Sequence, residues 1–151
     1  MIVQDIHLNK YDWDIRVYYA LDTYYIDDIL DDLMVIGCLP KELFTVEELF
    51  TSDELNRGYT FTNSRLKTSI VIIGKTSSAD EFQNTFDHEK GHLVMHISQS
   101  LGIDVYSEDY QYLAGNIGRA MFKEAKKFMC DCCRQKLFKR RIKYGWRIKF
   151  G

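Results

Sequence analysis

The sequence predicts a single α+β domain, in which a few-stranded, mostly antiparallel sheet packs on one long helix that a second helix follows. Three observations support this fold class: extended segments dominate the first 75 residues, a capped helix follows at 79–101, and a second amphipathic segment reaches about residue 133. A chain of 151 residues is long enough for one good core. The domain is expected to span residues 1–135, with 136–151 as a basic aromatic C-terminal tail or edge strand.

The first twenty residues are predicted to be extended, and β-branched and aromatic residues are densest over 15–21. Apolar residues at helical spacing predict a helix over 24–35 that stops near Gly37. Pro40 is predicted to begin a short helix that runs through Phe44. Residues 45–48 resemble a helix capping box and predict the start of another helix.

A β-hairpin is predicted next. Residues 59–62 alternate in polarity, Asn63-Ser64 is typical of a turn, and residues 66–73 form the returning strand.

Two helices complete the predicted domain. Ser78 and Glu81 form a capping box for a helix over 79–101, and Gly102 ends it. The second helix is predicted to run from about Ser107 to about Cys133.

Composition excludes several classes of protein. Hydrophobic residues make up 46% and charged residues 28% of the chain, which argues against disorder. The apolar runs fall short of the roughly 18 residues that a membrane span needs. The N-terminus lacks the basic and apolar regions of a signal peptide, so a cytoplasmic protein is expected.

Charge divides the chain into an acidic body and a basic tail. Residues 1–118 contain 8 Lys and Arg against 20 Asp and Glu, whereas residues 119–151 contain 12 against 2. In the tail, aromatic and basic residues alternate, so it could bind nucleic acid weakly, or form an edge strand against the acidic body. A period of two disfavours an amphipathic membrane helix. The candidate nucleic-acid contacts are Arg140, Arg141, Lys143, Trp146, Arg147 and Lys149.

The most informative segment is the HExxH pattern formed by His88, Glu89 and His92. Residues four apart lie on one face of a helix, so both imidazoles can bind one metal ion. Glu89 borders the same face and can take a proton from the water that zinc activates. The pattern therefore predicts a zinc site with Glu89 as general base.

A catalytic zinc needs a third protein ligand. Glu108 is the first candidate, because it follows the Gly102 break and a helical hairpin would fold it back over His92; Asp109 is its rival. His96 lies one turn beyond His92, too far along a rigid helix to share the ion, and is expected to be a second-shell or pocket residue.

The cysteines suggest no disulfide framework. Cys130, Cys132 and Cys133 lie within four residues, far from Cys38, and no second Cys or His pair stands at zinc-finger spacing. They are expected to be ordinary reduced thiols.

Two segments, 85–93 and 107–115, together resemble compact gluzincin metallopeptidases, in particular the small HExxH proteins of phages and mobile elements. They are more distantly similar to peptidases of the ImmA/IrrE type. The resemblance covers roughly residues 68–133, and Gln111 departs from the small residue of the family's second motif.

The resemblance implies a zincin-like fold, Zn²⁺ bound by His88, His92 and Glu108, and Glu89 as general base. It further implies that the strand at 68–73 borders the cleft and pairs with a peptide or protein substrate. Tyr112 is either an oxyanion donor or a buried structural tyrosine, and Gly91 is expected to pack closely on the sheet. A phage-encoded protein would act in the host cytoplasm.

The leading hypothesis is therefore a zinc metallopeptidase. The alternative is a non-catalytic, zinc-containing phage accessory or structural module whose basic tail binds nucleic acid or a partner protein.

Overall fold

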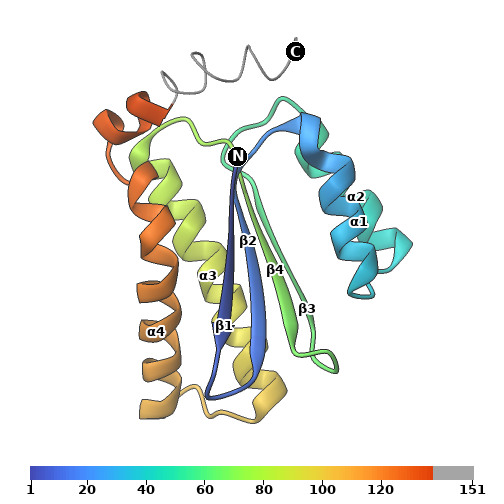
Figure 1. Ribbon diagram of the computed structural model, residues 1–151, viewed down its shortest axis with the longest axis vertical. Helices are drawn as coiled ribbons and strands as arrows, with labels where there is room; N and C mark the ends of the chain where they lie inside the picture. The colour runs from blue at the N-terminus through green and yellow to red at the C-terminus, as the bar shows by residue number, and fades with distance from the viewer. Residues whose placement is uncertain (138–151) are drawn as a thin grey trace.

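The computed structural model describes residues 1–137, which form a four-stranded sheet with helices on both faces (Figure 1). The strands lie in the order β1-β2-β4-β3. Their bounds are β1 Ile2–Leu8, β2 Trp13–Leu21, β3 Gly58–Asn63 and β4 Thr68–Gly74. The pairs β1/β2 and β3/β4 are antiparallel, and β2/β4 is parallel. The α+β class is thus confirmed, whereas the expected mostly antiparallel sheet is a mixed one.

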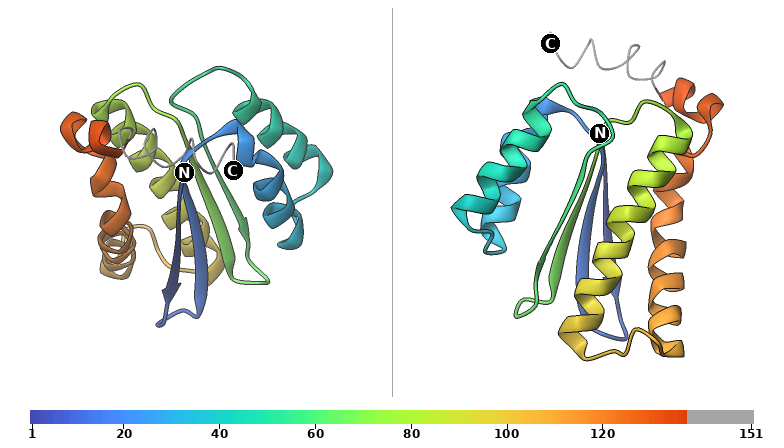
Figure 2. Two further views of the ribbon diagram at one scale, coloured as in Figure 1. Left: turned by 45° about the horizontal axis from the view of Figure 1, so that its top comes forward. Right: turned by 180° about the vertical axis from the view of Figure 1, so that it is seen from behind.

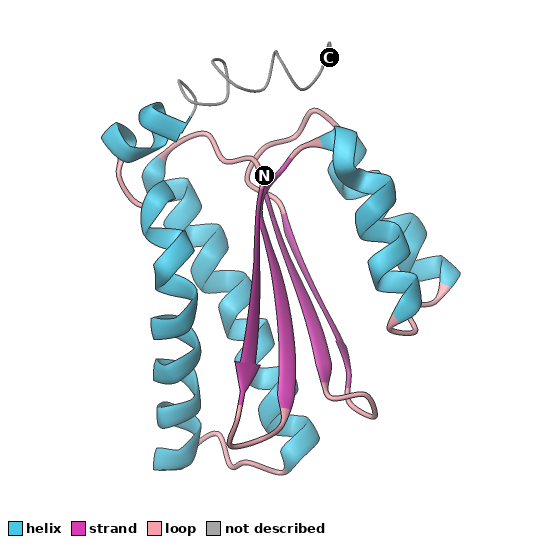
Figure 3. Cartoon of the chain, viewed as in Figure 1, coloured by secondary structure: helices cyan, strands magenta, loops and turns pink. Residues whose placement is uncertain are grey.

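Helices cover the two faces of the sheet in pairs (Figure 2). One pair is α1 and α2, which follow the short 3-10 turn η1; the other is α3 and α4, and a second 3-10 turn, η2, follows α4 (Figure 3). Residues 131–137 are helical as well. The bounds are η1 Thr23–Tyr25, α1 Ile26–Val35, α2 Pro40–Thr51, α3 Ala79–Leu101, α4 Glu108–Ala125 and η2 Lys126–Phe128.

Burial explains why β4 lies inside the sheet. Its residues from Ser69 to Gly74 are all buried, and such a continuous apolar run is typical of a strand covered on both faces. Val71 and Ile73 face the core under α3 and α4, whereas Ile70 and Ile72 face the core under α1 and α2. The chain therefore builds two apolar cores, one on each face of the two central strands β2 and β4.

The capping residues of α3 are confirmed. Ser78 Oγ accepts a hydrogen bond from the Glu81 amide, which satisfies a free N–H of the first turn. Gly102 ends the helix with φ at +69°, a left-handed conformation that glycine adopts without strain. The cap at Ser78 and the stop at Gly102 define the first and last residues of the helix that carries the HExxH pattern.

The predicted break within 40–51 is wrong, because α2 is one continuous helix. Val46 and Phe50 are buried one turn apart, so the apolar stripe continues past the predicted boundary. Thr45 lies inside the helix, and its hydroxyl donates to the Lys41 carbonyl oxygen at 3.2 Å rather than capping a new helix.

Helix α4 is shorter than the last helix predicted from the sequence. It ends at Ala125, and η2 then turns the chain so that Phe128 is buried. The ring of Phe128 stacks on Phe82 at a centroid distance of 5.0 Å and on Tyr19 at 6.0 Å. This aromatic packing accounts for the bend that the helical pattern did not reveal.

Most of the predicted tail, including its candidate nucleic-acid contacts, lies outside the described residues. Within residues 1–137, none of the helices has the length and apolar character that crossing a membrane would require.

Gly91 does not pack closely on the sheet, contrary to expectation. It is exposed, and a Cβ built on it would meet no atom within 4 Å.

Gly91→Ala should therefore raise the free energy of unfolding by about 1 kcal/mol, because alanine loses less backbone entropy in a helix. Urea denaturation measures the change. Gly102→Ala is the matched control and should lower stability by about 1 kcal/mol, because its φ is positive; equal effects of the two variants would contradict this account.

Candidate metal site

The structure brings His88 and His92 together on the exposed side of α3. Their Nε2 atoms are 3.1 Å apart, and the rings meet edge to face with centroids at 4.8 Å. Two nitrogens bound to one tetrahedral zinc at about 2.0–2.1 Å would be roughly 3.3 Å apart. The pair is thus already spaced to bind one metal ion, and both side chains are exposed to solvent.

Glu89 completes the group but points in a different direction. It is only 4% exposed and lies between α3 and β3, where Thr60 Oγ1 donates to its Oε2 at 2.6 Å. The ligand atoms of His88, Glu89 and His92 all lie within 4.8 Å of one another. These three residues could therefore hold a metal ion, with the carboxylate either on the ion or beside it.

Gly58 makes room for the Glu89 side chain. A Cβ at Gly58 would lie 2.5 Å from Glu89 Cγ and 2.8 Å from Oε1. A side chain at this position of β3 would push the Glu89 side chain out of its observed place against the strand. Gly58 and Thr60 were not predicted as site residues, although residues 58–62 alternate small or polar residues with Tyr59 and Phe61.

His96 lies one turn after His92, and the two ring centroids are 6.0 Å apart. Its Nδ1 is 3.0 Å from Thr62 Oγ1, which in turn lies 2.8 Å from Ser69 Oγ. Burial lowers the pKa of His96 below its ordinary value, and electrostatic repulsion from His92 lowers it further. His96 therefore lies half-buried beside a chain of two hydroxyl groups.

A polar groove of roughly 330 Å³ adjoins this end of the histidine row. It is lined by Thr62 and Ser64 from the β3–β4 hairpin and by His96, Gln99 and Ser100 from α3. The hydroxyls of Ser64 and Ser100 lie 2.6 Å apart across it. The groove could accept a small polar side chain next to the metal site.

The strand beside the site is β3, not the segment 68–73 that was expected. That segment is β4, which pairs with β2 on one side and β3 on the other and has no free edge. Within the described part of the chain, β3 pairs only with β4 and is an edge strand. An edge strand can bind an extended peptide through its free backbone groups.

Glu108 and Asp109 are not part of the metal-ligand group. They begin α4, which packs on the β1 side of α3: Gln4 of β1 donates to the Ala120 carbonyl oxygen at 2.8 Å, and Gly118 lies against Lys90. The side chains of Glu89 and His96 contact β3, which lies at the opposite edge of the sheet.

The position of Glu108 and Asp109 along α4 also separates them from the histidines. Glu108 is ten residues from Gly118, or about 15 Å along the axis, and so lies alongside the C-terminal end of α3 rather than His92. The structure does not bring either predicted third ligand to the histidines, although α3 and α4 do form a helical hairpin.

Tyr112 is 65% exposed on α4. The interpretation of a buried structural tyrosine is therefore wrong. Because α4 lies on the far side of α3 from the histidines, the structure offers no contact by which Tyr112 could bind an oxyanion at the metal site.

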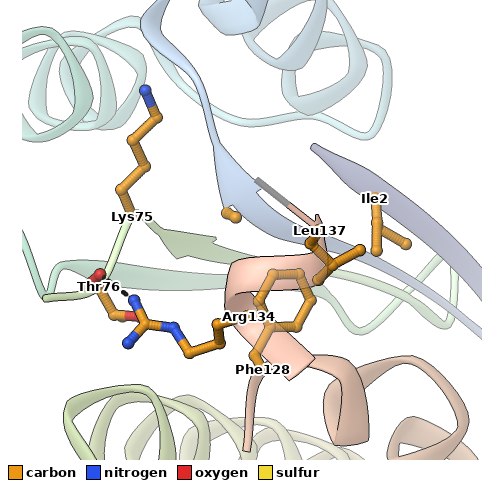
Figure 4. A pocket seen from close by; sticks show the side chains of 7 residues that line it. Ile2, Lys75, Thr76, Phe128, Arg134 and Leu137 are labelled. Atoms are coloured by element: carbon orange, nitrogen blue, oxygen red, sulfur yellow. Dashed lines mark hydrogen bonds between the residues drawn. The ribbon is translucent and has the colours of Figure 1, made fainter. Parts of the chain in front are cut away.

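A separate cavity lies at the other end of the sheet (Figure 4). Its volume is about 50 Å³, and Ile2, Phe128 and Leu137 supply its apolar walls beside Lys75 and Arg134. That volume suits only one or two water-sized groups. None of the predicted site residues lines it.

The chain matches no protein-family model, no curated protein and no solved structure.

Gly58→Ala should displace the Glu89 carboxylate and destabilise the protein by roughly 1–3 kcal/mol, as overpacking of a buried contact does. Urea denaturation of Gly58→Ala, Glu89→Ala and the double variant tests the contact. Removal of the Glu89 side chain should make the alanine at position 58 much less harmful. Strict additivity of the two single effects would show that the contact does not matter for stability.

Proposed function

We propose that the protein is a zinc-dependent metallopeptidase. The observation that supports this most strongly is the 3.1 Å spacing of His88 and His92 Nε2 beside a buried carboxylate, all next to an edge strand. Imidazole nitrogen is a preferred zinc ligand, and two protein nitrogens leave coordination positions open for water and substrate. Zinc, when bound, polarises a substrate carbonyl and makes a bound water more acidic.

Each protein group then has a task of its own. Glu89 accepts the proton of the attacking water, and Thr60 holds the carboxylate in position by a hydrogen bond to Oε2. The free edge of β3 orients an extended peptide by backbone hydrogen bonds, and the groove at His96 receives a polar side chain of that peptide.

One observation favours the second candidate, a non-catalytic zinc-containing module. Glu89 is almost completely buried and hydrogen-bonded to Thr60, as a purely structural carboxylate would be. In that case zinc would stabilise the fold, and no peptide would be cleaved.

Digestion of a broad peptide library separates the two functions. The metallopeptidase predicts cleavage by the zinc-loaded protein, loss of cleavage with a chelator, and its return when zinc is added back. His88→Ala is the matched negative control. If the zinc-loaded protein cleaved no peptide and zinc raised its thermal stability, the result would instead support the structural module.

A further inference from the structure

A second group of reactive side chains lies outside the histidine site, just after η2. Cys130 and Cys132 are exposed there, and Cys133 is half-buried. The remaining cysteine, Cys38, is buried in the core under α1 and α2 and does not join them.

The backbone brings Cys130 and Cys133 together. Cys130 immediately precedes the helical residues 131–137, and the Cys133 amide donates a hydrogen bond to Cys130 Sγ at 3.2 Å. Side chains three residues apart lie on the same side of such a turn, and the hydrogen bond holds the Cys133 backbone next to Cys130 Sγ. Cys132 is two residues from Cys130 and points to another side of the turn.

The turn is held in place by two contacts, one with the first residue of α3 and one with the segment between β4 and α3. Asp131 Oδ1 accepts a hydrogen bond from the Ala79 amide at 3.2 Å. Arg134, only 9% exposed, donates to the Thr76 carbonyl oxygen at 2.6 Å (Figure 4). The turn that carries both cysteines is therefore anchored to the body of the domain.

The two thiols are chemically unequal. A hydrogen bond from the Cys133 thiol, followed by one from the Cys133 backbone amide, lowers the pKa of Cys130. The hydrogen bond between the two thiols raises the pKa of Cys133. The thiolate is the nucleophile in thiol–disulfide exchange, so Cys130 is the attacking residue and Cys133 the resolving one.

We propose that Cys130 and Cys133 form a redox-active dithiol pair that is oxidised by small disulfides such as oxidised glutathione. The Cys130 thiolate attacks one glutathione sulfur, breaks the glutathione S–S bond and releases one glutathione thiolate. Cys133 then loses its proton and attacks Cys130 Sγ, which releases the second glutathione. Two electrons pass from the dithiol to glutathione, and one intramolecular disulfide forms.

The test treats the reduced full-length chain with oxidised glutathione in the presence of a chelator, so that bound metal protects no thiol. Unreacted thiols are alkylated and counted by mass spectrometry, and peptides are mapped. The wild type should lose two thiols per chain, retain no glutathione and show a Cys130–Cys133 bridge. Cys133→Ser should accumulate one glutathione on Cys130, because the resolving thiol is missing.

Cys132→Ser is the matched control and should behave like the wild type. Cys130→Ser should react markedly more slowly than Cys133→Ser, because the more acidic thiol is gone. A bridge that includes Cys132, stable glutathione on the wild type, or equal rates for Cys130→Ser and Cys133→Ser would each overturn the proposal. The readout does not depend on peptidase activity. The result can therefore refute the dithiol proposal without bearing on the metallopeptidase proposal.

Discussion

Replacement of His92 by alanine should abolish tight zinc binding. Two imidazoles at 3.1 Å form the candidate metal-binding pair, and a single remaining histidine would leave Glu89 as its only neighbour in the group. Loss of a residue that merely orients a ligand typically costs 10–100-fold in metal affinity, so loss of a ligand should cost at least about 100-fold. Competition with a chromophoric chelator measures the affinity.

Three control variants make that experiment decisive. His88→Ala should match His92→Ala. Glu108→Ala should keep the affinity of the wild type, because Glu108 begins α4 on the far side of α3. His96→Ala should change the affinity by no more than about tenfold, the lower part of the range for outer residues. A large loss in Glu108→Ala would show that α4 moves toward the histidines when zinc binds, and would contradict the ligand set described above.

Glu89→Gln should lower the peptidase rate by about 10²–10⁴, the usual contribution of a general acid or base. Glutamine has almost the same shape and can still accept the hydrogen bond from Thr60, so fold and zinc content should be retained. Only the ability to take a proton from the attacking water is lost. The experiment compares initial rates of the two proteins at equal zinc content on the same cleaved peptide.

Thr60 provides a second readout for that prediction. Thr60→Val removes the donor to Glu89 Oε2 and should reduce the rate, whereas Thr60→Ser should restore it. Cleavage by Glu89→Gln at the rate of the wild type would exclude Glu89 as the base.

The α3 helix and the pairing of its two histidines could be predicted from the sequence because their signals are local. Ser78 and Gly102 mark the two ends of α3 through backbone chemistry within one turn. The spacing of His88 and His92 then determines which side of the helix they share. No long-range contact is needed for either inference.

The remaining site could not be predicted because it depends on packing between distant segments. The parallel pairing of β2 and β4 places β3 at the edge, so the strand beside the histidines is β3 rather than β4. The position of α4 over β1 depends on contacts such as that of Gln4 with Ala120, 116 residues apart. A motif indicates that Glu108 opens a helix, but it cannot indicate on which side of α3 that helix packs.

Gly58 and Thr60 illustrate an intermediate case. Their alternation with Tyr59 and Phe61 indicates that one face of the strand is small and polar. That this face meets Glu89 follows only from the structure.

X-ray absorption spectroscopy of the protein loaded with one equivalent of zinc identifies the atoms that bind the ion. We expect nitrogen and oxygen neighbours only, with scattering from two imidazoles at about 2.0–2.1 Å that is reduced in His92→Ala. Sulfur scatterers at about 2.3 Å would place the ion at Cys130, Cys132 and Cys133 instead, and would contradict a metal site formed by His88 and His92.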